Sequence, residues 1–219
     1  MSVPVPLDDR PWPEEAPPEE FGAAWRRLAP AARRCLELAH RSLRGGGLAV
    51  GAVLTDEAGV IVAEGRNRAY DPPGGDDVLQ GTPLAHAEMN ALAGVRTERE
   101  LGGHVLWSSH EPCAMCAAAA AFTGVGTVRY VARDPWALAT GQPSSSAEAL
   151  GDSAWETCAH VLFLRGIVQQ RGAGHPTVRG NAGIAPEAVR IATCPDFPDT
   201  EDVAELCAVL WGRIACKPS

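Results

Sequence analysis

The sequence predicts an α/β fold, and three observations carry this prediction. Residues 48–54 form a continuous apolar run, which is typical of a central strand covered on both faces. A turn at residues 56–59 and a return strand at residues 60–63 follow it. Helical and extended patterns then alternate as far as Ala132, as in a sheet packed between helices.

The chain before the first strand divides into an arm and two helices. Residues 1–20 alternate prolines with acids and offer little to bury, so we expect a disordered arm. Residues 21–28 and 30–43 read as helices, and Pro30 suits a first helical turn. The second helix has an apolar stripe that consists of Cys35, Leu36, Leu38, Ala39 and Leu43.

The middle of the chain continues the alternation. Residues 70–83 contain three prolines and three glycines and are expected to form a loop. Thr82-Pro83 makes a suitable start for a helix over about residues 84–95. Residues 101–109 and 127–132 are the next two strands.

Beyond Asp134 the pattern weakens. We expect a flexible polar segment at 135–152, a helix at 155–170, a loop at 171–186, a fifth strand at 189–193 and a final helix at about 200–215. The resulting organisation is a disordered arm over residues 1–20 and one domain over residues 21–219 with a C-terminal helical extension.

The charge of the chain is negative and lies at its two ends. The formal net charge is −8, from 19 Lys+Arg and 27 Asp+Glu. Residues 1–20 hold six acids and one base, and residues 196–219 hold five acids and two bases, so residues 21–195 are neutral. A chain with no basic stripe has little to attract a phosphate backbone, which weighs against a nucleic-acid partner.

The cysteines and the hydropathy favour a reducing, aqueous compartment. Seven cysteines are present, and those outside the motif described next have no repeating spacing. No run approaches eighteen apolar residues, and the first twenty residues do not resemble a leader peptide. We therefore expect a cytoplasmic protein without a membrane partner.

Two short motifs carry the chemistry. His86-Ala-Glu88 places a histidine two residues before a glutamate, and Pro112-Cys113-Ala-Met-Cys116 places two cysteines one helical turn apart. One imidazole and two thiolates are natural zinc ligands, and they leave a fourth tetrahedral position open for a water. A redox pair, a closed structural zinc site or coincidence are the alternatives for Cys-x-x-Cys, but neither a thioredoxin-like context nor a second such pair is present.

The pair of motifs resembles the cytidine deaminase superfamily of zinc enzymes. The resemblance covers about residues 48–134 and implies three layers, α/β/α, with a mixed five-stranded sheet. Glu111-Pro-Cys-Ala-Met-Cys is similar to the branch of tRNA adenosine, guanine and fungal cytosine deaminases. His86-Ala-Glu-Met-Asn-Ala is also similar to deoxycytidylate deaminases, so the motifs leave the substrate open.

The resemblance also implies roles for single residues. His86, Cys113 and Cys116 would hold one Zn²⁺ per chain with a bound water or hydroxide, and Glu88 would move protons during hydrolytic deamination. Glu111 is explained as well by a favourable charge at a helix N-terminus as by catalysis. The resemblance implies substrate-binding positions, which are Asn67, the backbone at Ala87, and His110, which departs from the pattern. Asn67 in an ordinary turn and His110 facing solvent are the alternatives.

The function that we expect is therefore a zinc-dependent deaminase of a small nucleobase or nucleoside, with purines slightly favoured, acting as a homodimer. A cytidine or deoxycytidylate substrate is the nearest alternative. Editing of a flipped base in tRNA is a second alternative, which the charge distribution disfavours. The third is a catalytically silent zinc scaffold, which has no need of Glu88. Trp136, Trp155 and Phe197 are candidates for stacking on a base, although an isolated aromatic is more often in the core.

Overall fold

The computed structural model describes residue 12 and residues 19–74, 77–141 and 145–215. Its centre is a mixed five-stranded sheet with the strand order β2-β1-β3-β4-β5. Strand β1 is antiparallel to both β2 and β3, whereas β3, β4 and β5 are parallel. The strands are β1 (Gly51–Thr55), β2 (Ile61–Arg66), β3 (Val105–His110), β4 (Thr127–Ala132) and β5 (Glu148–Ala149).

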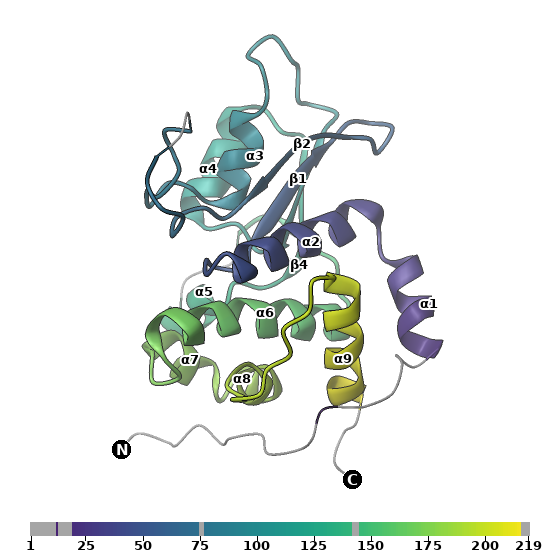
Figure 1. Cartoon of the computed structure of the whole chain (residues 1–219). Coiled ribbons are helices and arrows are strands. Elements are labelled where there is room, and N and C mark those ends of the chain that lie inside the picture. The colour runs from purple at the N-terminus through teal and green to yellow at the C-terminus, as the bar shows by residue number, and fades with distance from the viewer. Residues whose placement is uncertain (1–11, 13–18, 75–76, 142–144, 216–219) are drawn as a thin grey trace.

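Helices cover both faces of the sheet, which confirms the predicted three layers. Helices α3 (Ala87–Ala93) and α4 (Ala114–Phe122) lie side by side on one face, as Figure 1 shows. Helices α2 (Pro30–Arg44) and α6 (Ser153–Arg171) cover the other. The remaining helices are α1 (Glu19–Arg27), α5 (Pro135–Thr140), α7 (Pro176–Asn181), α8 (Pro186–Ala192) and α9 (Val203–Ala215).

The last three helices form an additional layer outside α2 and α6 (Figure 1). Helix α6 is buried along most of its length because it packs on α2 and β4 on one side and on α7, α8 and α9 on the other. Near α9, Trp155, Trp25, Phe21 and Trp211 form an aromatic cluster with ring centroids 4.8 to 6.0 Å apart. No helix in the described part of the chain has the length and apolar character needed to cross a bilayer.

The prediction of a fifth strand at 189–193 is wrong. Residues 189–192 belong to α8, and Thr193 is its C-cap. The buried side chains of this helix are Ala188, Val189, Ile191 and Ala192. Positions i, i+1, i+3 and i+4 share one helix face, and Pro186 supplies the first turn. The fifth strand is instead β5, in the segment 135–152 that composition marked as flexible and that also contains α5.

Two further expectations need correction. The expected loop at 171–186 contains α7, because Pro176 starts a helix that His175 caps through its side chain. The last two residues of the expected disordered arm, Glu19 and Glu20, belong to α1. Trp12 packs edge-on against Phe197 with centroids 5.9 Å apart, and residues 1–11 and 13–18 lie outside the described part.

The strand directions bring several chain segments to one edge of the sheet. Strands β3 and β4 are parallel, so their ends at His110 and Ala132 meet at the same edge. Strand β1 is antiparallel to β3, so its beginning at Gly51 lies at this edge too. In open α/β sheets the carboxyl ends of neighbouring parallel strands are the usual position of a ligand site.

Two strand glycines allow helices to approach the sheet closely. A Cβ at Gly51 would lie 2.2 Å from the carbonyl oxygen of Cys35 in α2. A Cβ at Gly65 would lie 2.4 Å from the carbonyl oxygen of Ala87 and 2.5 Å from the backbone nitrogen of Ala91, both in α3. These neighbours are backbone atoms, which cannot rotate away, so a side chain at Gly65 would displace α3 itself.

We expect Gly65→Ala to destabilise the protein by about 1–3 kcal/mol, the usual cost of overpacking a core. Urea unfolding monitored by circular dichroism measures this change. Gly102→Ala is the matched control, because a Cβ there meets no atom within 4 Å. Equal stability of the two variants would show that α3 does not depend on the glycine.

Candidate metal centre and its cavity

The three predicted ligands meet at the starts of two neighbouring helices. His86 immediately precedes α3, Cys113 immediately precedes α4, and Cys116 lies in the first turn of α4. Free backbone N–H groups at a helix start favour negative charge, so this position stabilises thiolates. The structure therefore brings together the three side chains that the motifs predicted as ligands, although His86 lies 27 and 30 residues before the two cysteines in the sequence.

The spacing of the ligand atoms fits a tetrahedral zinc ion. The Sγ atoms of Cys113 and Cys116 lie 3.7 Å apart, and the Nδ1 atom of His86 lies 3.7 and 3.6 Å from them. With Zn–S near 2.3 Å and Zn–N near 2.0 Å, a tetrahedron has S–S and S–N edges of about 3.8 and 3.5 Å. Among the described residues, this is the one group of three or more possible ligands that is close enough to share an ion.

The shifted pKa values of the two cysteine thiols also favour a cation at this position. Hydrogen bonds from Cys116 and His86 lower the pKa of Cys113 to about 3, so its sulfur is a thiolate. The hydrogen bond with Cys113, together with burial, raises the pKa of Cys116 well above its usual value. Two adjacent thiolates repel one another, and a dication between them would remove that conflict.

Glu88 lies beside these ligands and is almost fully buried, with 3% of its surface exposed. Ser108 donates a hydrogen bond of 2.8 Å to its Oε1 atom, and its Oε2 atom lies 3.5 Å from the sulfur of Cys116. Burial raises the pKa of the carboxyl group, although the bond from Ser108 opposes this effect. Glu88 is thus held in a fixed orientation and can carry a proton closer to neutral pH than an exposed glutamate.

A cavity of about 400 Å³ opens beside Cys113. Asp134 and Trp136, which follow the end of β4, line it together with Glu111, which follows the end of β3. The Oδ1 atom of Asp134 accepts a hydrogen bond of 2.8 Å from the backbone nitrogen of Trp136 and so caps α5. Trp136 is 47% exposed and offers its ring to the cavity, whereas the carboxylates of Asp134 and Glu111 offer polar contacts.

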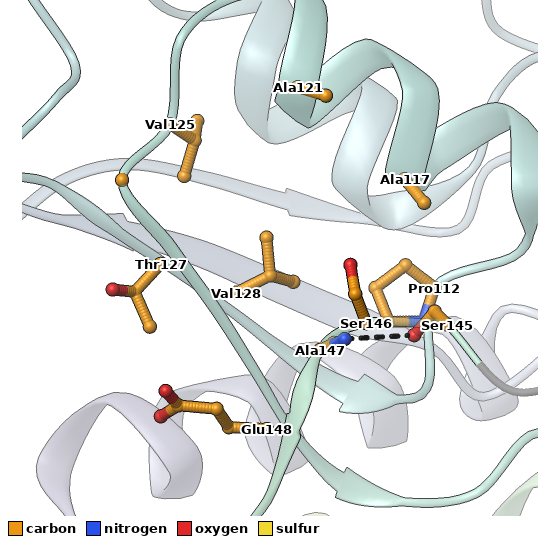
Figure 2. Close-up of a pocket in the computed structure, with 11 residues that line it drawn as sticks. Pro112, Ala117, Ala121, Val125, Thr127, Val128, Ser145, Ser146, Ala147 and Glu148 are labelled. Carbon is orange, nitrogen blue, oxygen red and sulfur yellow. Dashed lines mark hydrogen bonds between the residues drawn. The ribbon is translucent and has the colours of Figure 1, made fainter.

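Glu111 joins this cavity to the chain that leads into β5. Its Oε1 atom accepts a hydrogen bond of 2.5 Å from the backbone nitrogen of Ser145. A second cavity of about 230 Å³ shares Pro112, Ala117 and Ser145 with the first. Figure 2 shows Ala117 and Ala121 of α4 on one side of it and residues 145–148 on the other. Glu111 therefore positions a wall of the cavity, beyond any effect on the start of α4.

Two predicted substrate-binding residues lie at the same sheet edge as the ligands. Asn67 directly follows β2 and is buried, and its Oδ1 atom accepts a hydrogen bond from the backbone nitrogen of Ala69. Ala87 is the first residue of α3, so its N–H has no acceptor within the helix. Neither residue lines the 400 Å³ cavity.

His110 is placed differently from the other predicted residues. Its ring lies 5.1 Å from that of Phe163 and 6.3 Å from that of His160, both in α6, and it does not line the cavity at Cys113. Burial lowers its pKa to about 3, so the imidazole is neutral. The structure therefore shows His110 packed against α6, away from Cys113.

Sequence reasoning missed Ser108 and Asp134 as members of the site. Two polar residues at 108 and 109, inside an otherwise apolar strand, were the available signal for Ser108. Asp134-Pro135 is a helix-start pattern that indicates the cap but not the cavity. Of the candidate aromatic residues, Trp155 is in the core and Phe197 stacks with Arg165 at 4.7 Å, so Trp136 alone of the three lines the cavity.

Comparison with known proteins places this site in a family. Residues 27–132 match the family model described as the cytidine and deoxycytidylate deaminase zinc-binding region. A tRNA-specific adenosine deaminase of Haemophilus influenzae is 38% identical over 91 residues, which make up 40% of this chain and 47% of that protein. The chain thus spans about half the length of this relative.

Solved structures with similar chains include deaminases of different substrates. A guanine deaminase of Bacillus subtilis is 29% identical with a TM-score of 0.42, over 52% of this chain and 69% of that chain. A dCMP deaminase of the cyanophage S-TIM5 is 25% identical with a TM-score of 0.40, over 61% of this chain and 98% of that chain.

We expect the purified protein to contain about one zinc ion per chain and Cys113→Ser to lose it, because a serine hydroxyl is a poor zinc ligand. Inductively coupled plasma mass spectrometry of the dialysed proteins measures the content. Cys158→Ala is the matched control, since Cys158 is buried in α6 outside the cluster and its loss should leave zinc unchanged. Full zinc in Cys113→Ser would refute the ligand assignment.

Proposed function

Residues 27–132 belong to the cytidine deaminase superfamily, and we propose that this chain is a zinc-dependent hydrolytic deaminase of a small nucleobase or nucleoside. The observation that carries the proposal is the combination of three ligand atoms at tetrahedral spacing with a buried carboxylate beside them. A purely structural zinc site would be closed by a fourth protein ligand and would not need Glu88.

Each residue of the site has a part in the proposed reaction, in which water replaces the amino group of a cyclic amidine and ammonia leaves. Bound zinc would supply a Lewis acid and lower the pKa of water. Glu88 accepts one proton from the attacking water and passes it to the adjacent ring nitrogen. It then takes the remaining proton of the added hydroxyl group and gives it to the amino group, which leaves as ammonia. Ser108 keeps the carboxylate oriented through its hydrogen bond to Oε1, and His86, Cys113 and Cys116 hold the ion.

A purine is the substrate that we favour. The supporting observation is the 38% identity to a tRNA-specific adenosine deaminase over the motif region. The cavity of about 400 Å³ is large enough for a nucleobase or nucleoside. Within it the ring of Trp136 can stack on a base. Asn67 and Ala87 do not line this cavity but lie at the same sheet edge, and we propose that Asn67 and the N–H of Ala87 contact the polar edge of the bound base from there.

The charge of the chain favours a small substrate over a folded RNA. The net charge of the chain is −8. The residues that line the cavity include two acids, Glu111 and Asp134, and no lysine or arginine. A tRNA ligand would need positive charge near this opening to bind its backbone. The tRNA-specific relative nevertheless makes an anticodon stem-loop a necessary member of any substrate test.

Ammonia release from a panel of substrates tests the proposal. The panel contains adenosine, guanosine, guanine, cytidine, cytosine, deoxycytidylate and a tRNA anticodon stem-loop. We expect turnover of a purine base or nucleoside. Glu88→Gln is the matched control, because it keeps the shape of the side chain and removes its proton transfer, which should lower kcat by about 100- to 10,000-fold.

Each result of the panel discriminates between functions. Activity only on cytidine, cytosine or deoxycytidylate would replace the purine with a pyrimidine. Activity only on the stem-loop would identify an RNA-editing enzyme. Zinc bound at full occupancy without turnover of any member would favour a silent zinc scaffold, and undiminished activity of Glu88→Gln would assign the proton transfer to another group.

We also propose that the enzyme is a homodimer that associates through the outer face of α4. Ala114, Ala118 and Ala121 are exposed on this helix, and Phe122 at its end is 92% exposed. Small side chains allow close approach of a second helix, and an exposed phenylalanine would be buried by it. The α2 and α6 face is already covered by α7, α8 and α9.

Light scattering should therefore give a mass near twice the 23.0 kDa of the chain. We expect Phe122→Glu to reduce it to the mass of one chain, because a buried charge without a partner is costly. Ile184→Glu, at an exposed apolar residue between α7 and α8, is the control and should leave the mass unchanged. A monomeric wild type, or a dimeric Phe122→Glu variant, would contradict the proposed interface.

A further inference from the structure

A cavity of about 550 Å³ lies outside the metal centre, between α2, α6 and the segment that precedes α9. None of the residues that line it also lines the cavity at Cys113. Its polar walls are formed by His40 and Arg44 of α2 and by Arg165 and Gln169 of α6. Its apolar walls are Leu43, Phe197, Pro198 and Leu206.

Arg165 lines this cavity, and no carboxylate among the described residues makes an ion pair with it. Its Nη1 atom donates to the carbonyl oxygens of Ala192 and Cys194, at 3.3 and 3.0 Å, and its guanidinium stacks on Phe197 at 4.7 Å. These contacts fix the group, yet its buried Nε atom has no acceptor. Burial lowers the pKa of Arg165, as expected for a cation that lacks a counter-charge.

His40 is a second polar group at this cavity, and its ring nitrogens are not among the buried polar atoms that lack a partner. Its side chain is 4% exposed, lines the cavity, and makes no hydrogen bond with any part of the chain that the structure describes. Burial, followed by the charge of Arg44, lowers its pKa, so the imidazole is neutral at pH 7 and has one N–H to donate. A bound acceptor in the cavity would give this N–H a hydrogen-bond partner within the protein.

The described acids around the cavity do not supply a counter-charge for Arg165. Glu201 pairs with Arg44 at 3.4 Å, at a solvent-exposed position. Asp199 lines the cavity but is itself exposed, and it makes no ion pair with Arg165. The last carbonyl groups of α2 accept hydrogen bonds from the N–H groups of residues 45–47, so they do not compete for the donors.

From these contacts we propose that the cavity binds a small organic oxyanion, a carboxylate or a phosphate, between Arg165 and His40. The guanidinium supplies the charge and the imidazole supplies a further hydrogen bond, as in charge-assisted recognition of oxyanions. The apolar part of the ligand would lie on Leu43 and Leu206. The volume of the cavity lies within the range of small-molecule sites.

Thermal unfolding of the full chain tests the proposal. The probes are sodium phosphate, sodium acetate and sodium hexanoate, each compared with sodium chloride at equal ionic strength. We expect phosphate or hexanoate to raise Tm saturably, by about 3–6 °C at ten times its Kd. Stronger binding of hexanoate than of acetate would identify a carboxylate with an apolar body, whereas a response to phosphate alone would identify a phosphate.

Variants then locate the site. Arg165→Gln should abolish the ligand-dependent rise, whereas Arg171→Gln, at an exposed arginine in the last turn of the same helix, should keep it. If Arg165→Gln does not fold, His40→Asn carries the test and should weaken the binding at least tenfold. A rise equal to that in chloride, or one that persists in both Arg165→Gln and His40→Asn, would overturn the proposal.

Discussion

The thiols of Cys113 and Cys116 lie 3.7 Å apart at the start of α4, and much of the structure serves to hold them there beside His86. Their proximity is unfavourable unless a cation lies between them, because the charge of one sulfur suppresses the ionisation of the other. The start of α3 and the start of α4 must therefore meet at one point. The parallel pair β3 and β4 sets the position of α4, and the close approach at Gly65 sets that of α3.

Once the ligands are in place, burial determines the chemistry available beside them. Glu88 is buried in the first turn of α3, where Ser108 of β3 donates a hydrogen bond to its side chain. Burial raises the pKa of Glu88, and the bond from Ser108 fixes its orientation. The same sheet edge supplies the walls of the cavity through Glu111 and Asp134, which follow β3 and β4. The proposed proton transfer and substrate binding would thus depend on residues that come from different strands and meet at a common edge of the sheet.

The helices after β5 have a separate role in the architecture. They cover α2 and α6, which leaves α3 and α4, and with them the metal centre, uncovered on the other side of the sheet (Figure 1). Their packing also creates the second cavity, which is lined by Arg165 and His40. Among the described residues, Arg165 donates to two carbonyl oxygens but makes no ion pair, and His40 makes no side-chain hydrogen bond. A layer that is added far from the catalytic residues can in this way provide a binding site of its own.

The sequence by itself determined the parts of this protein that depend on local spacing. The candidate ligands were predicted from His-x-Glu and Cys-x-x-Cys, since one helical turn fixes the distance between the two cysteine side chains. The strand at 127–132 was predicted from its position after Gly124 and Gly126. The tertiary structure decided the features that depend on contacts between residues far apart in the sequence. Ser108 and Asp134 join the site only because β3 and β4 are neighbours, and His110 turns to α6 because Phe163 and His160 lie there. Residues 189–192 form part of a helix and not a strand, because one face of this helix packs on α6 and the core. A short run with β-branched residues does not reveal this packing.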